Sequence, residues 1–234
     1  MNDLDLINEE LFECVEDALQ HAMVKRTPPE ELIRRIRFRY PYPVFFIESS
    51  EYMLRQTGLS NAEAFYFWMI PGVARRTARE AFGEKPRLNT LSRMAEYLKA
   101  LFIGVHVECF YAILLDSRGG LIRTEMIGKG TVDSAPFDMG RMLALLVDHS
   151  AKAVVMCHNH PCGTMQPSKE DLRCTLDALA ATATISVPLL DHIIIAKNRA
   201  VSIRDSGYIA ADLWMMQGAG KKLVRDWVDV DLFV

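Results

Sequence analysis

The sequence lacks the marks of several large protein classes. No apolar run approaches the roughly 18 residues that a membrane helix needs, and the first residues are acidic where an export signal would be basic. Basic side chains are in the minority, with 27 Lys and Arg against 30 Asp and Glu and a net charge of −3. A surface-wide basic platform for nucleic acid is therefore not expected, although a local basic patch stays open. We expect a cytoplasmic protein with no membrane partner.

The signatures of common zinc and phosphate sites are missing as well. The five cysteines contain no CxxC pair, so we interpret them as reduced thiols, most of them small core residues. No His-Glu-x-x-His occurs, and the zinc deaminase pattern fails because His160 stands where it needs glutamate. Segment 218–221 is no phosphate loop, since no Ser or Thr follows its lysine. These absences exclude zinc ribbons, His-Glu-x-x-His proteases, deaminases and P-loop enzymes.

What is present is an ordinary globular composition, with 50% hydrophobic and 24% charged residues in a chain of 234. Its charge is unevenly placed. Residues 1–24 hold seven acidic and no basic side chains, with apolar residues at helical spacing, which predicts an acidic amphipathic helix. Residues 25–39 hold six basic side chains against two acidic ones. The basic side of this second helix either meets phosphates or is a solvated partner of the acidic helix.

A helical hairpin is predicted near residues 60–82. A capping box at residues 60–63 opens a helix that ends at a Pro-Gly pair within residues 70–74, and a second helix with basic residues follows. This pattern resembles a helix-hairpin-helix unit, which holds a nucleic-acid phosphate on backbone N–H groups. Ala74 stands where the second glycine is usual, so a hairpin that only packs is the alternative. The candidate nucleic-acid-binding residues are Gly72, Arg75, Arg76 and Arg79.

Beyond residue 106 the chain becomes rich in strand formers. Strands interleaved with helices, with hairpins at both ends, predict a mixed α/β sheet flanked by helices. We expect an all-α region over residues 1–100, an α/β domain over 101–210 and a tail over 211–234. The expected elements are hairpins at 108–127 and 189–204, helices at 137–148 and 168–182, and a buried strand at 153–157.

Two histidines and an aspartate form a candidate metal site. His158 and His160 follow the strand at 153–157, and alternate residues of an extended chain share a face, so the two imidazoles lie close together. If Ser168 caps the next helix, Asp171 lies in its first turn and points back toward the histidines. Two His and one Asp fill three corners of a tetrahedron around zinc and leave the fourth for water. Each part alone is also typical of a surface histidine pair and a plain capping box.

The full spacing carries a resemblance. His-x-His, seven residues, Ser, two residues, Asp is the JAMM pattern of the MPN (JAB) metalloprotease family, and residues 158–163 with Pro167, Ser168 and Asp171 are similar to its RadC branch. Segments 108–110, 130–135 and 190–195 agree with that branch, so the resemblance covers about residues 95–210. Cys162 departs from it, standing where serine is usual. The resemblance implies the mixed, cytidine-deaminase-like sheet of MPN/JAB domains.

The resemblance also implies a mechanism. His158, His160 and Asp171 would bind Zn²⁺, Glu108 would be the general base and proton shuttle, and Ser168 would help to stabilise the tetrahedral intermediate. The function expected is a zinc metallohydrolase that cleaves a peptide or isopeptide amide in a protein or peptide substrate. The alternative is a DNA-repair-associated factor, the label that RadC-type proteins carry, with DNA contact through the N-terminal region and an accessory metal site.

Two further residues are assigned less directly. His192 either supports a ligand from behind or is a hydrogen-bonded core histidine, and we favour the core. Cys157, inside the predicted strand, is interpreted as a packing residue.

Overall fold

The computed structural model describes residues 9, 13–15, 29–40, 46, 49–130 and 137–215. The acidic helix predicted for residues 1–24 lies mostly outside this set, as do residues 131–136 and the tail after residue 215. The chain forms two compact units, 1–76 and 77–234, so the boundary comes earlier than the predicted residue 100. In the described part of the chain, no helix is long and apolar enough to cross a bilayer.

The first unit is built from short helices around a small core. Its described elements are α2 (Pro29–Arg39), α4 (Glu51–Arg55) and the first part of α5 (Asn61–Glu80). Helix α2 begins at a proline, whose fixed φ suits a first helical position. Its buried Leu32 and Ile36 belong to the same core cluster as Phe46 and Phe67, whose rings meet edge to face with centroids 5.2 Å apart.

Helix α5 corrects the prediction of a helical hairpin at residues 60–82. The helix runs unbroken from Asn61 to Glu80 with Pro71 in its interior, so the predicted Pro-Gly turn is wrong. Gly72 does not adopt the positive φ of a turn glycine. Proline inside a helix costs about 3 kcal/mol, but Pro71 and Phe67, one turn earlier, are both buried. We attribute the continuous helix to burial of this face, which outweighs the local cost.

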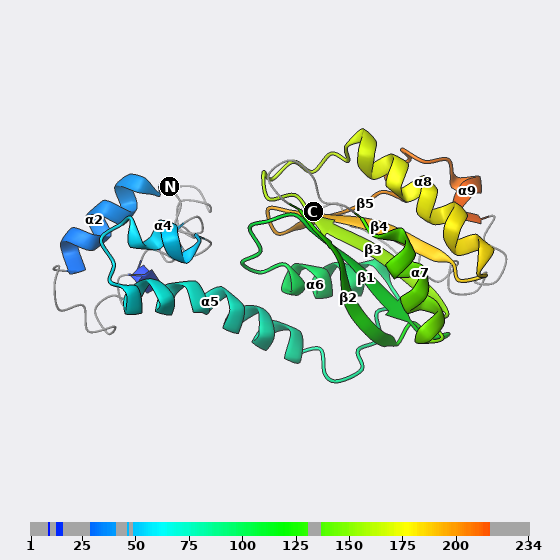
Figure 1. The fold of residues 1–234 in the computed structure, drawn as a ribbon, viewed down its shortest axis with the longest axis horizontal. Helices are drawn as coiled ribbons and strands as arrows, with labels where there is room; N and C mark the ends of the chain where they lie inside the picture. The colour runs from blue at the N-terminus through cyan, green and yellow to red at the C-terminus, as the bar shows by residue number, and fades with distance from the viewer. Residues whose placement is uncertain are drawn as a thin grey trace. The chain divides into compact units, whose positions relative to one another are not determined.

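The second unit contains one mixed five-stranded sheet in the order β2-β1-β3-β4-β5 (Figure 1). Strands β3 and β4 are parallel and the other neighbouring pairs are antiparallel. The predicted mixed α/β fold is confirmed. The strands are β1 (Cys109–Leu115), β2 (Leu121–Lys129), β3 (Ala153–Asn159), β4 (Leu189–Ala196) and β5 (Arg199–Ser202), and the helices after α5 are α6 (Leu91–Leu101), α7 (Met139–Asp148), α8 (Lys169–Thr184) and α9 (Ala211–Met215).

Helices cover both faces of the sheet (Figure 1). Helix α6 packs on one face, which explains why it belongs to the second unit, and α7, α8 and α9 pack on the other. Strand β3 is buried along its whole length, and its side chains alternate between the two layers. Val155 and Cys157 join the α6 layer, and Val154 and Met156 join the α8 layer. His158 is therefore directed toward α8.

Replacing Gly72 distinguishes a continuous helix from a hairpin. A Cβ at this position would meet only the Arg75 guanidinium, at 3.9 Å. We expect Gly72→Ala to raise the free energy of unfolding by about 0.5–1 kcal/mol, because alanine favours a helix interior over glycine. Urea unfolding followed by circular dichroism measures this change.

Gly83 supplies the matched control, since it has φ +81° and nothing within 4 Å of an added Cβ. Gly83→Ala should cost about 1 kcal/mol through backbone strain alone. A loss of stability in Gly72→Ala as large as that in Gly83→Ala would contradict the continuous helix.

Candidate metal centre

Strand β3 and the loop that follows it bring two imidazoles together. His158 is fully buried near the end of β3, and its Nε2 lies 2.9 Å from Nε2 of His160. The His160 backbone N–H donates to Ile195 in β4 at 2.9 Å, which extends the parallel pairing by one residue. The His160 ring donates from Nδ1 to the Thr164 carbonyl at 2.7 Å. With the proton held on Nδ1, a neutral His160 presents the lone pair of Nε2.

The first turn of α8 brings a carboxylate to the same place. Ser168 caps the helix, and its N–H and hydroxyl donate to Asp171 Oδ2 at 2.8 and 2.7 Å while the Asp171 N–H donates to Ser168 Oγ at 3.0 Å. Burial by itself would raise the pKa of Asp171, but its interactions with the imidazoles of His158 and His160 outweigh this effect and hold that pKa well below its usual range. Asp171 is therefore a buried carboxylate anion.

The three side chains fit a metal ion. Asp171 Oδ1 lies 3.1 Å from His158 Nε2, and Oδ2 lies 3.4 Å from His160 Nε2. Tetrahedral ligands about 2.0 Å from a zinc ion lie about 3.3 Å from one another. The group could thus hold a metal ion, and within the described ranges no fourth His, Cys, Asp or Glu joins it. Cys162, which is exposed, is outside the group.

His158 is also held from behind. The Phe110 ring stacks on it with centroids 4.3 Å apart and planes at 17°. His158 Nδ1 lies 2.8 Å from Nε2 of His192, and His192 Nδ1 lies 2.7 Å from the hydroxyl of Thr175 in α8. Burial lowers the pKa of His192 well below its usual value, so the ring is neutral. His192 is buried, as the core interpretation requires, but its ring also contacts a candidate ligand directly, which is the alternative that we did not favour.

Glu108 stands immediately before β1, partly buried. The side chain of Asn159 fixes this segment, since its amide donates to the carbonyls of Val105 and Val107 at 3.3 and 3.0 Å and its oxygen accepts from the Cys109 N–H at 2.9 Å. A hydrogen bond to Asp171 raises the pKa of His160 most, and the Glu108 charge adds a smaller increase. The Glu108 carboxylate therefore acts electrostatically on this imidazole.

The structure thus brings together the three predicted metal ligands and places Ser168 against Asp171. Glu108 stands just before β1, and its assignment as the base stays a prediction. The four candidate nucleic-acid-binding residues instead lie along one helix, and Arg79 donates to the Tyr97 hydroxyl at 3.4 Å. Cys157 lies in the core cluster on the α6 side, and burial raises the pKa of its thiol. Sequence reasoning missed Phe110 and Thr175, because only strand pairing and helix packing bring them to the site. It also gave no role to Asn159, whose hydrogen bonds to the segment before β1 appear only in the fold.

Comparison with known proteins identifies the family. A family model described as a RadC-like JAB domain matches residues 88–208, more than half of the chain. The chain belongs to the RadC-like JAB family. A UPF0758 protein of Shewanella amazonensis is 31% identical over 164 residues, which cover 70% of this chain and 73% of that protein. A UPF0758 protein of Shewanella baltica is 35% identical over 137 residues, which cover 58% of this chain and 61% of that protein.

Membership of the RadC-like JAB family confirms the resemblance. JAB domains are often metallohydrolases, and this one carries a His-His-Asp group that could bind a metal ion. The chain spans 61% of the Shewanella baltica relative.

The contact between His160 and Asp171 has a measurable consequence. In metal-free protein we expect His160 to titrate above the ordinary histidine value of about 6.5, because the Asp171 anion favours the imidazolium. Asp171→Asn should return its pKa toward about 6.5. Glu170→Gln, an exposed acid in the same helical turn, should leave it unchanged. An NMR titration of the His160 ring in chelator-treated samples gives these values, and titration at or below the ordinary value in the unaltered protein would contradict the described contact.

Proposed function

We propose that this RadC-like protein is a zinc-dependent hydrolase that cleaves a peptide or isopeptide amide in a protein or peptide substrate. The convergence of His158 Nε2, His160 Nε2 and the Asp171 carboxylate carries the proposal. Catalytic zinc sites use three protein ligands and keep one position for water, whereas structural sites close with four. A set of two imidazoles and one carboxylate matches the catalytic kind, and zinc accepts both ligand types.

The roles of the chain's own groups follow from their positions. Bound zinc would lower the pKa of a water molecule to about 7 and polarise the substrate carbonyl. Glu108 would take the proton released as water attacks the carbonyl and deliver it to the leaving amine. Its influence on His160 supports this role, because a base must lie beside the ligands without being one of them. Asn159 would keep Glu108 in place by fixing the residues on both sides of it.

Ser168 would serve the same reaction in two ways. Its N–H and hydroxyl orient the Asp171 carboxylate, and the N–H alone still holds Oδ2 if the hydroxyl turns away. The hydroxyl would then be free to donate to the oxyanion of the tetrahedral intermediate. Charge-stabilising donors of this kind contribute when they are aimed at charge that develops in the transition state.

Metal analysis and two substitutions test the proposal. We expect purified protein to hold about one zinc per chain, because three ligands converge at one point, and His158→Ala to lose it. Glu108→Gln should keep the metal and lower amide hydrolysis about a hundredfold or more, as expected for a lost general base. Elemental analysis and cleavage of a peptide library measure the two effects.

His149→Ala is the matched control, since His149 lies at the end of α7, outside the group, and should change neither quantity. Unaltered protein that takes up no zinc would overturn the proposal. Hydrolysis that is equally fast in Glu108→Gln would remove Glu108 from the mechanism.

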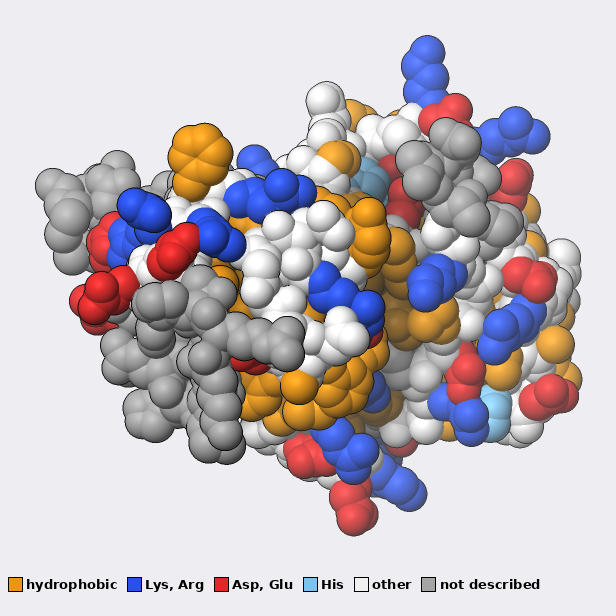
Figure 2. Space-filling view, turned by 60° about the vertical axis from the view of Figure 1, so that its left-hand side comes forward, with side chains coloured by type: hydrophobic (Ala, Val, Ile, Leu, Met, Phe, Trp, Pro, Cys, Tyr) orange, Lys and Arg blue, Asp and Glu red, His pale blue; other side chains and the backbone are white. Residues whose placement is uncertain are grey.

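The alternative, contact with DNA through the N-terminal region, has less support. The predicted Pro-Gly turn is absent, and two arginines of α2 are ion-paired, Arg35 with Glu31 and Arg37 with Glu9. The face drawn in Figure 2 carries basic and acidic side chains interspersed. If DNA binds through phosphates, its affinity must fall steeply with salt. Titration of duplex and single-stranded DNA at two salt concentrations decides, and no binding at low salt removes this alternative.

A further inference from the structure

We propose that Thr175 and His192 are positioning residues that hold His158 in the one tautomer able to bind a metal. The inference rests on the proposed metal site. Its basis is a chain of three hydrogen bonds that starts at the backbone carbonyl of Asp171 and ends at the ring of His158. Through these hydrogen bonds, the backbone carbonyl of Asp171 determines which ring nitrogen of His158 carries the proton.

The direction of the chain follows from its first bond. The Thr175 hydroxyl lies 2.6 Å from the Asp171 carbonyl oxygen, and a carbonyl only accepts, so the hydroxyl proton is committed there. Toward His192 Nδ1, 2.7 Å away, Thr175 can then only accept. Nδ1 of His192 therefore carries the proton, and Nε2 of the neutral ring is left as an acceptor.

The second half of the chain passes this constraint to the candidate ligand. His192 Nε2 lies 2.8 Å from His158 Nδ1, so His158 must donate from Nδ1. In a neutral imidazole a proton on Nδ1 leaves Nε2 with its lone pair. This Nε2 is the atom that faces His160 and Asp171. The opposite tautomer would place a proton where the metal must bind.

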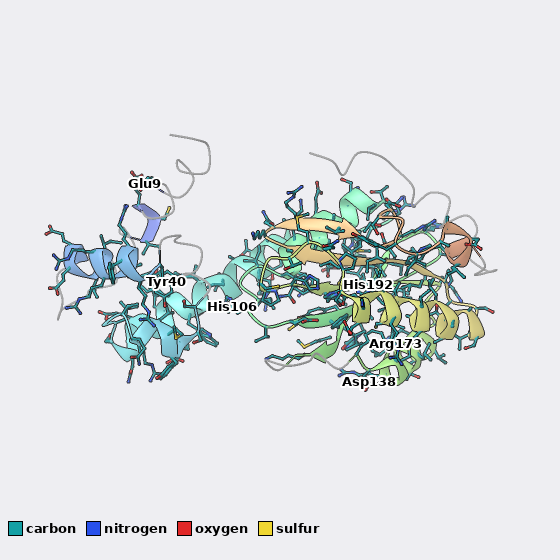
Figure 3. All side chains as sticks on the ribbon, turned by 90° about the horizontal axis from the view of Figure 1, so that it is seen from above. Glu9, Tyr40, His106, Asp138, Arg173 and His192 are labelled. Atoms are coloured by element: carbon teal, nitrogen blue, oxygen red, sulfur yellow. The ribbon has the colours of Figure 1, made fainter. Side chains whose placement is uncertain are left out.

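Burial stabilises this chain of hydrogen bonds. Thr175, His192 and His158 each have 0% of their surface exposed, so solvent does not compete for these bonds. Figure 3 places His192 in the interior of the second unit, among the strands and near α8. Rotation of the His158 ring would be opposed by Phe110, which stacks on its face. Neither the proton pattern nor the ring orientation can change without breaking a buried contact.

The same helix offers an internal control. Thr182 lies about two turns beyond Thr175 on the buried side of α8, and it too has 0% exposed surface. Its hydroxyl donates to the Ala178 carbonyl at 2.8 Å, four residues back, as Thr175 does to Asp171. Thr182 differs in having no histidine partner among its hydrogen bonds to described residues. Valine at the two positions therefore removes equivalent backbone contacts, and at Thr175 alone breaks the chain to His158.

Zinc affinity of the full-length protein, measured by competition with a chromophoric chelator, tests the inference. We expect Thr175→Val to weaken Zn²⁺ binding about tenfold or more, within the range of about 10–100-fold seen when a hydrogen-bond partner of a metal-binding histidine is removed. Thr175→Ser keeps the hydroxyl and should bind as the unaltered protein does. Thr182→Val should also leave the affinity unchanged. Equal weakening by Thr175→Val and Thr182→Val would reduce Thr175 to a structural role and overturn the inference.

A spectroscopic measurement keeps the test independent of metal loading. Long-range ¹H–¹⁵N NMR spectra of metal-free, unaltered protein at about pH 8, above the ordinary histidine range, should show the Nδ1–H tautomer for both His158 and His192. An Nε2–H tautomer at His158 would overturn the proposed chain of hydrogen bonds even if Thr175→Val failed to fold. If the protein takes up no zinc but shows the expected tautomers, the proposed function fails and the chain of hydrogen bonds stands as a structural feature.

Discussion

The parallel pairing of β3 with β4 is the constraint on which the site depends. Parallel neighbours cannot be joined by a tight turn and need a crossover of a dozen or more residues, here supplied by the loop after β3 and α8. Such a crossover starts where the first strand ends, so the beginning of its helix lies near the carboxyl ends of the strands. His158 and His160 occupy that end of β3, and Asp171 lies in the first turn of α8. The candidate site is a consequence of topology.

Asp171 concentrates several roles in one residue. Its side chain completes the capping box, and its carboxylate faces both imidazoles. The N-terminus of a helix favours negative charge, which suits an anion in the first turn. Its backbone carbonyl accepts the Thr175 hydroxyl. A substitution at Asp171 would therefore disturb the start of the helix and the metal group together. A substitution at Thr175 would alter only the hydrogen bonds that reach His158 through His192.

Much of the second unit was predictable because its signals are local. Alternating apolar residues, the turn residues of two hairpins and a capping box marked the strands and helices, and the spacing of His158, His160 and Asp171 marked the site. The contacts behind His158 were not predictable, since β4 and α8 meet there through strand register and helix packing. The largest error was the hairpin at Pro71. Proline and glycine are strong local breakers, but the burial of Pro71 and Phe67 is a tertiary effect that no short window contains.

Asn159 lies between the two candidate ligands in the sequence, and its side chain holds the segment before β1. Glu108 and the two candidate histidine ligands are therefore attached to the same strand, although 50 residues separate Cys109 from Asn159 along the chain. A thermal displacement of β3 carries ligands and base in the same direction. The separation between these histidines and the proposed base would then change little when the sheet moves.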